Sequence, residues 1–84
     1  MPPPRRSKPR SPEHGALGDA VRQIRLEAGM SQEDLAEAAG TDLTQVGGIE
    51  RGVRNPSFTT LLRLSAALQT SVGELTTLAS RLQK

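Results

Sequence analysis

The sequence contains no cysteine, and Phe58 is its one aromatic residue among 84 positions. Disulfide bonds and cysteine-ligated metal centres are therefore excluded. The core has to be built from Leu, Val, Ile, Ala and Met, which favours packed helices because strands prefer aromatic and β-branched residues. No apolar run approaches the roughly 20 residues that span a membrane, and the basic residues after Met1 precede no apolar segment of a secretory signal. We expect one small cytoplasmic domain without membrane attachment.

Catalytic side chains are equally scarce. The single histidine, His14, lies beside Gly15 in what resembles a linker, where we expect it to be solvated. No Ser-His-acid arrangement, phosphate-binding glycine loop or clustered acidic pair is evident. The sequence therefore predicts a protein without enzymatic activity, cofactor or metal site.

Proline and positive charge are concentrated at the start of the chain. Five of the six prolines fall within residues 1–14, and this stretch has no apolar periodicity. It also carries the basic residues Arg5, Arg6, Lys8 and Arg10. From Gly15 onward the chain has seven basic and eight acidic residues and is nearly neutral. We predict that residues 1–14 form a disordered basic arm, either a solvating tail or a DNA contact, and that residues 15–84 form the folded domain.

The remaining sequence indicates five short helices and no strand. Leu17, Val21, Ile24 and Ala28 share one helical face, which predicts a helix over about 16–28 that stops at Gly29. The starts of four further helices are indicated by residues that cap helix N-termini, namely Ser31, Asp42, Ser57 and Ser71. Gly40 and Gly52 are expected to end the second and third helices.

Residues 31–51 meet the requirements of two helices that cross at a steep angle through a tight turn. Ala36 is small enough for close approach, and Gly40 tolerates a positive φ at the turn. Leu35, Val46 and Ile49 supply apolar inner faces. Together these features predict a helix-turn-helix motif.

Residues 17–75 resemble the Cro/C1-type, or XRE-type, helix-turn-helix family. The matching stretches are Leu17-Gly18, Ile24-Arg25, Met30–Ala36, Ala39-Gly40, Ile49–Gly52, Arg54–Ser57, Leu61-Leu62 and Ser71–Leu75. The resemblance implies an all-α, five-helix, lambda-repressor-like domain that binds double-stranded DNA sequence-specifically and regulates transcription. The strings Gly48–Arg51 and Arg54-Asn55 also resemble the controller proteins of restriction–modification systems.

The family resemblance also implies roles for individual residues. The segment from Leu43 to Arg51 would lie in the major groove. The residues expected to face the bases are Leu43, Thr44, Gln45, Gly47 and Gly48. Those expected on phosphates are Gln32, Arg51, Arg54 and Asn55. Arg25 and Glu50 are expected to form a structural ion pair between the first and third helices.

The glycine pair 47–48 leaves three interpretations open. Two glycines in a helix cost roughly 0.8–1 kcal/mol each relative to alanine and remove side chains from the predicted reading surface. The backbone could approach DNA closely, sequence specificity could be weak, or this surface could contact protein. Leu43 raises the same question, because it offers a base only apolar contact.

Leu75, Leu78 and Leu82 form a stripe on the last predicted helix. They either close the core or form a two-fold homodimer interface, which would place two reading helices roughly 34–36 Å apart. No segment suggests a small-molecule effector. The alternative to a DNA-binding regulator is a protein-interaction adaptor or antitoxin-like module that retains the fold.

Overall fold

The computed structural model describes residues 9–83, and these contain five α-helices and no strand. The helices are α1 (Pro12–Glu27), α2 (Gln32–Ala39), α3 (Leu43–Glu50), α4 (Phe58–Ala67) and α5 (Val72–Leu82). The predicted all-α, five-helix fold is confirmed. The predicted arm residues Arg5, Arg6 and Lys8 lie outside the described residues.

The first helix begins at Pro12, four residues before the predicted start at Ala16. Ser11 caps it, since its hydroxyl accepts the backbone N–H of His14, and Pro12 occupies the first turn, where its missing N–H is not needed. His14 is therefore not in a linker. It is half-buried in the first turn of α1, where its Nδ1 is hydrogen-bonded to Ser11 Oγ.

The other four helices begin at the predicted caps. The side chains of Ser31, Asp42, Ser57 and Ser71 each accept a backbone N–H from the residue three positions on. At Ser31 the capping is reciprocal and forms a capping box, because the Asp34 carboxylate in turn accepts the Ser31 backbone N–H at 2.9 Å. This hydrogen bond lowers the pKa of Asp34 below its usual value.

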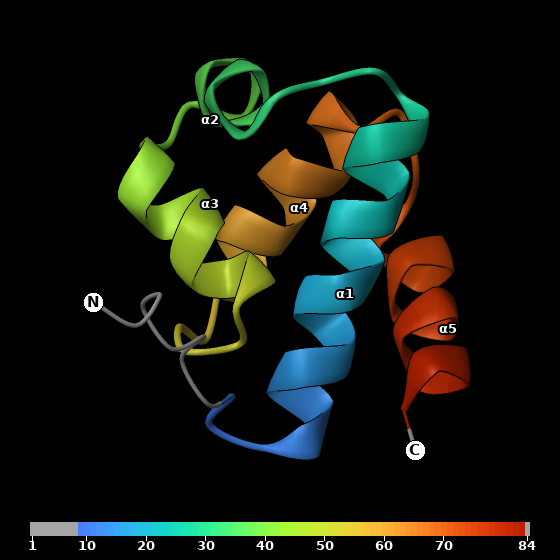
Figure 1. Cartoon of the computed structure of the whole chain (residues 1–84). Coiled ribbons are helices and arrows are strands. Elements are labelled where there is room, and N and C mark those ends of the chain that lie inside the picture. Colours follow the sequence, from blue (N-terminus) through green and yellow to red (C-terminus); the bar gives the residue numbers. More distant parts are fainter. Residues whose placement is uncertain (1–8, 84) are drawn as a thin grey trace.

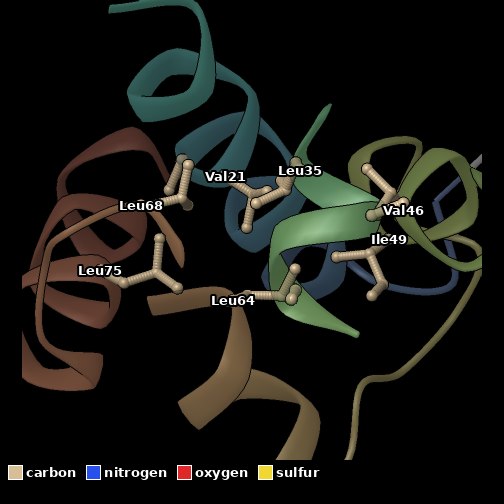
Figure 2. Close-up of a cluster of buried hydrophobic side chains, with 10 residues drawn as sticks. Val21, Leu35, Val46, Ile49, Leu64, Leu68 and Leu75 are labelled. Carbon is tan, nitrogen blue, oxygen red and sulfur yellow. The ribbon is translucent and has the colours of Figure 1, made fainter. Parts of the chain in front are cut away.

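The core lies where all five helices meet, and it is wholly aliphatic (Figure 2). Its largest fully buried side chains are Val21, Leu35, Val46, Ile49, Leu64 and Leu75. Phe58 is 67% exposed, so the aromatic residue takes no part in the core. Leu75, proposed above as a dimer residue, is 0% exposed, and Leu78 and Leu82 pack against the same cluster. The leucine stripe therefore closes the core.

The position of α3 is set by a close approach to α1, which packs against α5 on its other side (Figure 1). Gly18 lies at the crossing. A Cβ atom added there would lie 2.5 Å from the carbonyl oxygen of Glu50 and closer still to that of Ile49. Because backbone atoms cannot yield as a side chain can, only glycine allows α1 to meet the end of α3 at this distance.

A buried ion pair fixes the same junction. Arg25 on α1 donates to both carboxylate oxygens of Glu50 on α3, at 2.6 and 3.0 Å, and also to the carbonyl oxygen of Met30 at 2.8 Å. Gln32 at the start of α2 donates to the same carboxylate at 3.1 Å. The hydrogen bonds to Glu50 raise the pKa of Arg25 above its usual value. The predicted pair is confirmed, and it links three helices.

Replacement of one partner should strongly destabilise the fold. Arg25→Met leaves the Glu50 carboxylate buried and uncompensated, which should lower the free energy of unfolding by about 3–5 kcal/mol. The double variant Arg25→Met/Glu50→Leu buries no charge and should recover most of that decrease. Urea unfolding followed by circular dichroism measures both, with the exposed Arg22→Ala on α1 as control. A decrease below about 1 kcal/mol for the single variant would contradict the structural role.

Candidate nucleic-acid interface

The helix-turn-helix motif is formed by α2, a three-residue connection and α3. The connection begins at Gly40, whose φ of 68° reverses the chain at the end of α2, and Thr41 N–H then bonds to the Ala36 carbonyl oxygen at 2.9 Å. Ala36 and Ala39 are buried, so small side chains line the inner face of α2. The predicted motif and its turn are confirmed.

Only the first turn of α3 presents its own side chains to solvent. Leu43 is 45% exposed, Thr44 is exposed, and Gln45 is half-buried. Every later residue of the helix, from Val46 to Glu50, is buried. The groups that α3 itself presents to solvent are therefore the hydroxyl of Thr44, the amide of Gln45 and the apolar side chain of Leu43.

Gly47 and Gly48, which were expected to face bases, lie beneath arginine side chains. A Cβ at Gly47 would lie 3.0 Å from Nη1 of Arg51, and one at Gly48 would lie 2.5 Å from Cδ of Arg54. Both glycines are buried for this reason. The expectation considered α3 alone, whereas the covering groups come from its end and from the loop that follows.

Three of the four residues expected on phosphates, Arg51, Arg54 and Asn55, gather beside the exposed turn of α3. An open depression of about 560 Å³ lies there. Its lining residues are Arg10, Thr44, Gln45, Arg51, Val53, Arg54 and Asn55. The lining contains three arginines and no acidic residue. Such a surface carries a local excess of positive charge that attracts a polyanion.

Gln32 lies apart from this depression. Its amide donates to Glu50 and its side chain is half-buried, at the edge of a second, smaller depression beside Arg22 and Arg51. One of its two amide hydrogens is therefore engaged within the protein.

Arg10 is held at the interface by its backbone. Its N–H donates to the carbonyl oxygen of Gly52 at 2.8 Å, and Pro9 packs against Gly15. A methyl group at Gly15 would lie 3.1 Å from Cγ of Pro9, which is tight. Arg10 was expected to belong to a disordered arm, and this attachment was not predicted. The signal in the sequence was the pair of glycines, Gly15 and Gly52, that leaves space for Pro9.

No group of three or more His, Asp and Glu side chains that could hold a metal ion occurs among residues 9–83. In the same part of the chain, no helix is long and apolar enough to cross a membrane.

Comparison with known proteins gives consistent matches to one family. A helix-turn-helix family model matches residues 21–75. Control protein C.SmaI of Serratia marcescens is 44% identical over 61 residues, which cover 73% of this chain and 73% of that protein.

Solved structures agree with the sequence matches. The restriction-modification controller protein C.AhdI from Aeromonas hydrophila matches with a TM-score of 0.76 and 40% identity, covering 77% of this chain and 98% of that one. The controller protein C.Esp1396I, solved as a tetramer with its natural 35 base-pair operator, matches with a TM-score of 0.78 and 32% identity, covering 86% and 95%. Because the family model spans more than half of the chain and the fold matches these structures, the chain belongs to the Cro/C1-type helix-turn-helix family of DNA-binding transcriptional regulators.

Proposed function

We propose that this protein regulates transcription by placing the first turn of α3 in the major groove of double-stranded DNA. The observation that carries the proposal is the gathering of Arg10, Arg51 and Arg54 around that turn, without an acidic neighbour in the lining. An α-helix fits the major groove, and arginines beside it reach the phosphates on either side. The proposal assigns the protein no catalytic step and places it in the cytoplasm with its DNA.

Sequence would be read by a small set of side chains. Gln45 has an amide that pairs with the N6 and N7 edge of adenine through two hydrogen bonds. Thr44 can bond a base edge, and the exposed Leu43 suits contact with a thymine methyl group. Gly47 and Gly48 offer no side chain to a base, and their covered positions favour reading by the first turn alone.

The phosphate contacts are assigned to Arg51, Arg54 and Asn55, which surround the end of α3. Gln32 retains a second amide hydrogen, which we assign to a phosphate as well. These groups would fix the register of α3 on the duplex but would carry no sequence information themselves.

Within the family, we propose that the protein is the controller of a restriction–modification system. The likeness to C.SmaI, C.AhdI and C.Esp1396I supports this narrower assignment. The adaptor and antitoxin-like alternatives would be favoured if the protein failed to shift duplex DNA.

Substitution of a base-reading residue and of a phosphate-contacting residue should have different effects on DNA binding. Gln45→Ala should change the preferred base at one position, with about 1–3 kcal/mol less discrimination there. Arg54→Ala should weaken binding to all sequences alike and lower the salt dependence, because each neutralised phosphate contributes about 0.9 to the log–log slope. Selection of binding sites from random duplexes, followed by titration at several salt concentrations, measures both.

Arg63→Ala, an exposed arginine on α4, is the matched control and should leave preference and slope unchanged. The assignment is wrong if Gln45→Ala and Arg54→Ala both bind the selected duplex as the original protein does.

The basic residues before Pro9 are proposed to contact DNA. The hydrogen bond between Arg10 and Gly52 supports this, because it brings the chain into the domain beside the end of α3. Deletion of residues 1–8 retains the Ser11 cap of α1, so thermal stability should not change. The deletion should lower the salt slope by about 0.9 for each phosphate that the basic side chains neutralise. The triple variant Arg5→Ala/Arg6→Ala/Lys8→Ala should lower the salt dependence of DNA binding in the same way. If the salt dependence is unchanged in both the deletion and the triple variant, residues 1–8 make no DNA contact.

A homodimer is part of the proposal, since one small domain offers few DNA contacts. Leu75 is buried and cannot lie in its interface, and Leu78 and Leu82 are already half-buried against the core. Phe58 and Leu62, one helical turn apart on α4, are 67% and 48% exposed. Large apolar side chains on one exposed face favour association with a second copy. C.Esp1396I is described as a tetramer on its operator, which supports an oligomeric regulator.

Phe58→Ser with Leu62→Ser should convert the dimer to a monomer without unfolding it, because neither side chain lies in the core. Sedimentation equilibrium measures the mass, and Thr77→Arg on the exposed face of α5 tests the alternative that the copies associate through α5. Dissociation by Thr77→Arg but not by the α4 variant would move the interface to α5.

A further inference from the structure

Gly48 lies in the second half of α3, where glycine is less favourable than alanine because it loses more backbone freedom on folding. Its φ is not in the left-handed region, so the backbone does not require glycine there. The reason for the glycine must lie in what occupies the space beside it.

That space is filled by the stem of Arg54. A Cβ at Gly48 would lie 2.5 Å from Cδ, 2.7 Å from Cγ and 2.9 Å from Nε of Arg54. Atoms at these separations would overlap, so any side chain at position 48 would displace the arginine. The contact runs along the stem rather than at its tip, and the whole direction of the side chain depends on it.

The backbone of Gly48 holds the same residue. Its carbonyl oxygen accepts the N–H of Val53 at 2.9 Å and the N–H of Arg54 at 3.2 Å. The loop after α3 is thereby turned back over the helix, and Arg54 starts beside Gly48 before its side chain crosses it. The hydrogen bonds of the Gly48 carbonyl oxygen fix the backbone position of Arg54, and the packing of its aliphatic stem on Gly48 fixes the direction of its side chain.

Gly47 differs in this respect. A Cβ there would meet only the tip of Arg51, at 3.0 Å from Nη1 and 3.9 Å from Cζ, with the Gln32 side-chain oxygen also at 3.9 Å. The end of a long side chain can move by a few tenths of an ångström at little cost. The tight packing on the stem is thus particular to position 48.

We propose that Gly48 is a positioning residue for DNA binding, which seats Arg54 across α3 so that its guanidinium is presented beside Thr44 and Gln45. This inference rests on the proposed function through the DNA contact of Arg54. A seated arginine gives up less side-chain freedom when it binds than a free one. Arg54, which lies in the loop, thereby places its guanidinium over α3 at a position where Gly48 has no side chain.

The test combines Gly48→Ala, Arg54→Ala and the double variant. Alanine is the better helix former, so Gly48→Ala should keep or raise Tm while weakening binding about tenfold. In the Arg54→Ala background the space is free, so Gly48→Ala should raise Tm further and should weaken binding no more. Fluorescence anisotropy with the selected duplex gives Kd, and circular dichroism gives Tm. Gly73→Ala on α5, where a Cβ meets only Ser71 Oγ at 3.7 Å, is the matched control and should leave Kd unchanged.

Unchanged binding by Gly48→Ala, together with weakened binding by Arg54→Ala, would overturn the inference and leave the proposed function intact. Effects on Kd that add in the double variant would also overturn it. If Arg54→Ala binds as the original protein does, both the inference and the assigned role of Arg54 fail. A weakening that varies with DNA sequence would support the positioning role and move Arg54 from a phosphate to a base edge.

Discussion

The buried pair of Arg25 and Glu50 sets the orientation of the surface that we propose binds DNA. Glu50 is the last residue of α3, and its carboxylate accepts hydrogen bonds from α1 and from the start of α2. Burial removes water from both charges, so neither can leave the pair without a large electrostatic penalty. The close approach at Gly18 holds the same end of α3 through the backbone. With that end fixed from two directions, the cap at Asp42 and the exposed first turn have one position relative to the body.

A consequence of this arrangement is that α3 is mostly a structural element. Five of its eight residues are buried, and only its first turn is open. The positive charge of the interface comes from outside the helix, from Arg51 at its end, Arg54 in the following loop and Arg10 before α1. In the proposed DNA complex, the first turn of α3 would therefore read sequence, and residues outside the helix would supply the electrostatic attraction.

The sequence predicted those features that depend on neighbours along the chain. Caps such as Ser31 and Asp42 act within three residues, and the turn at Gly40 is local in the same way. The ion pair and the motif could be predicted because they follow the family pattern. The predicted start of α1 was wrong because proline in its first turn resembles the proline-rich stretch before it, although the Ser11-Pro12 pair is itself a start signal.

Features that depend on distant segments and do not follow the family pattern were not predicted. The burial of Gly47 and Gly48 requires the course of the loop at Arg54, and the choice between core and dimer interface for Leu75 requires the packing of α5 on α1. The hydrogen bond between Arg10 and Gly52 joins residues that no periodicity relates.

That last bond has a practical consequence for handling the protein. The chain enters the domain beside Gly52, next to the depression with three arginines. A fusion tag attached ahead of Pro9 would therefore be tethered at the surface that we propose binds the duplex. The carboxyl end of α5 lies near the same end of α1, because Gln83 donates to the Glu13 carboxylate at 3.4 Å and lines a depression together with Pro9.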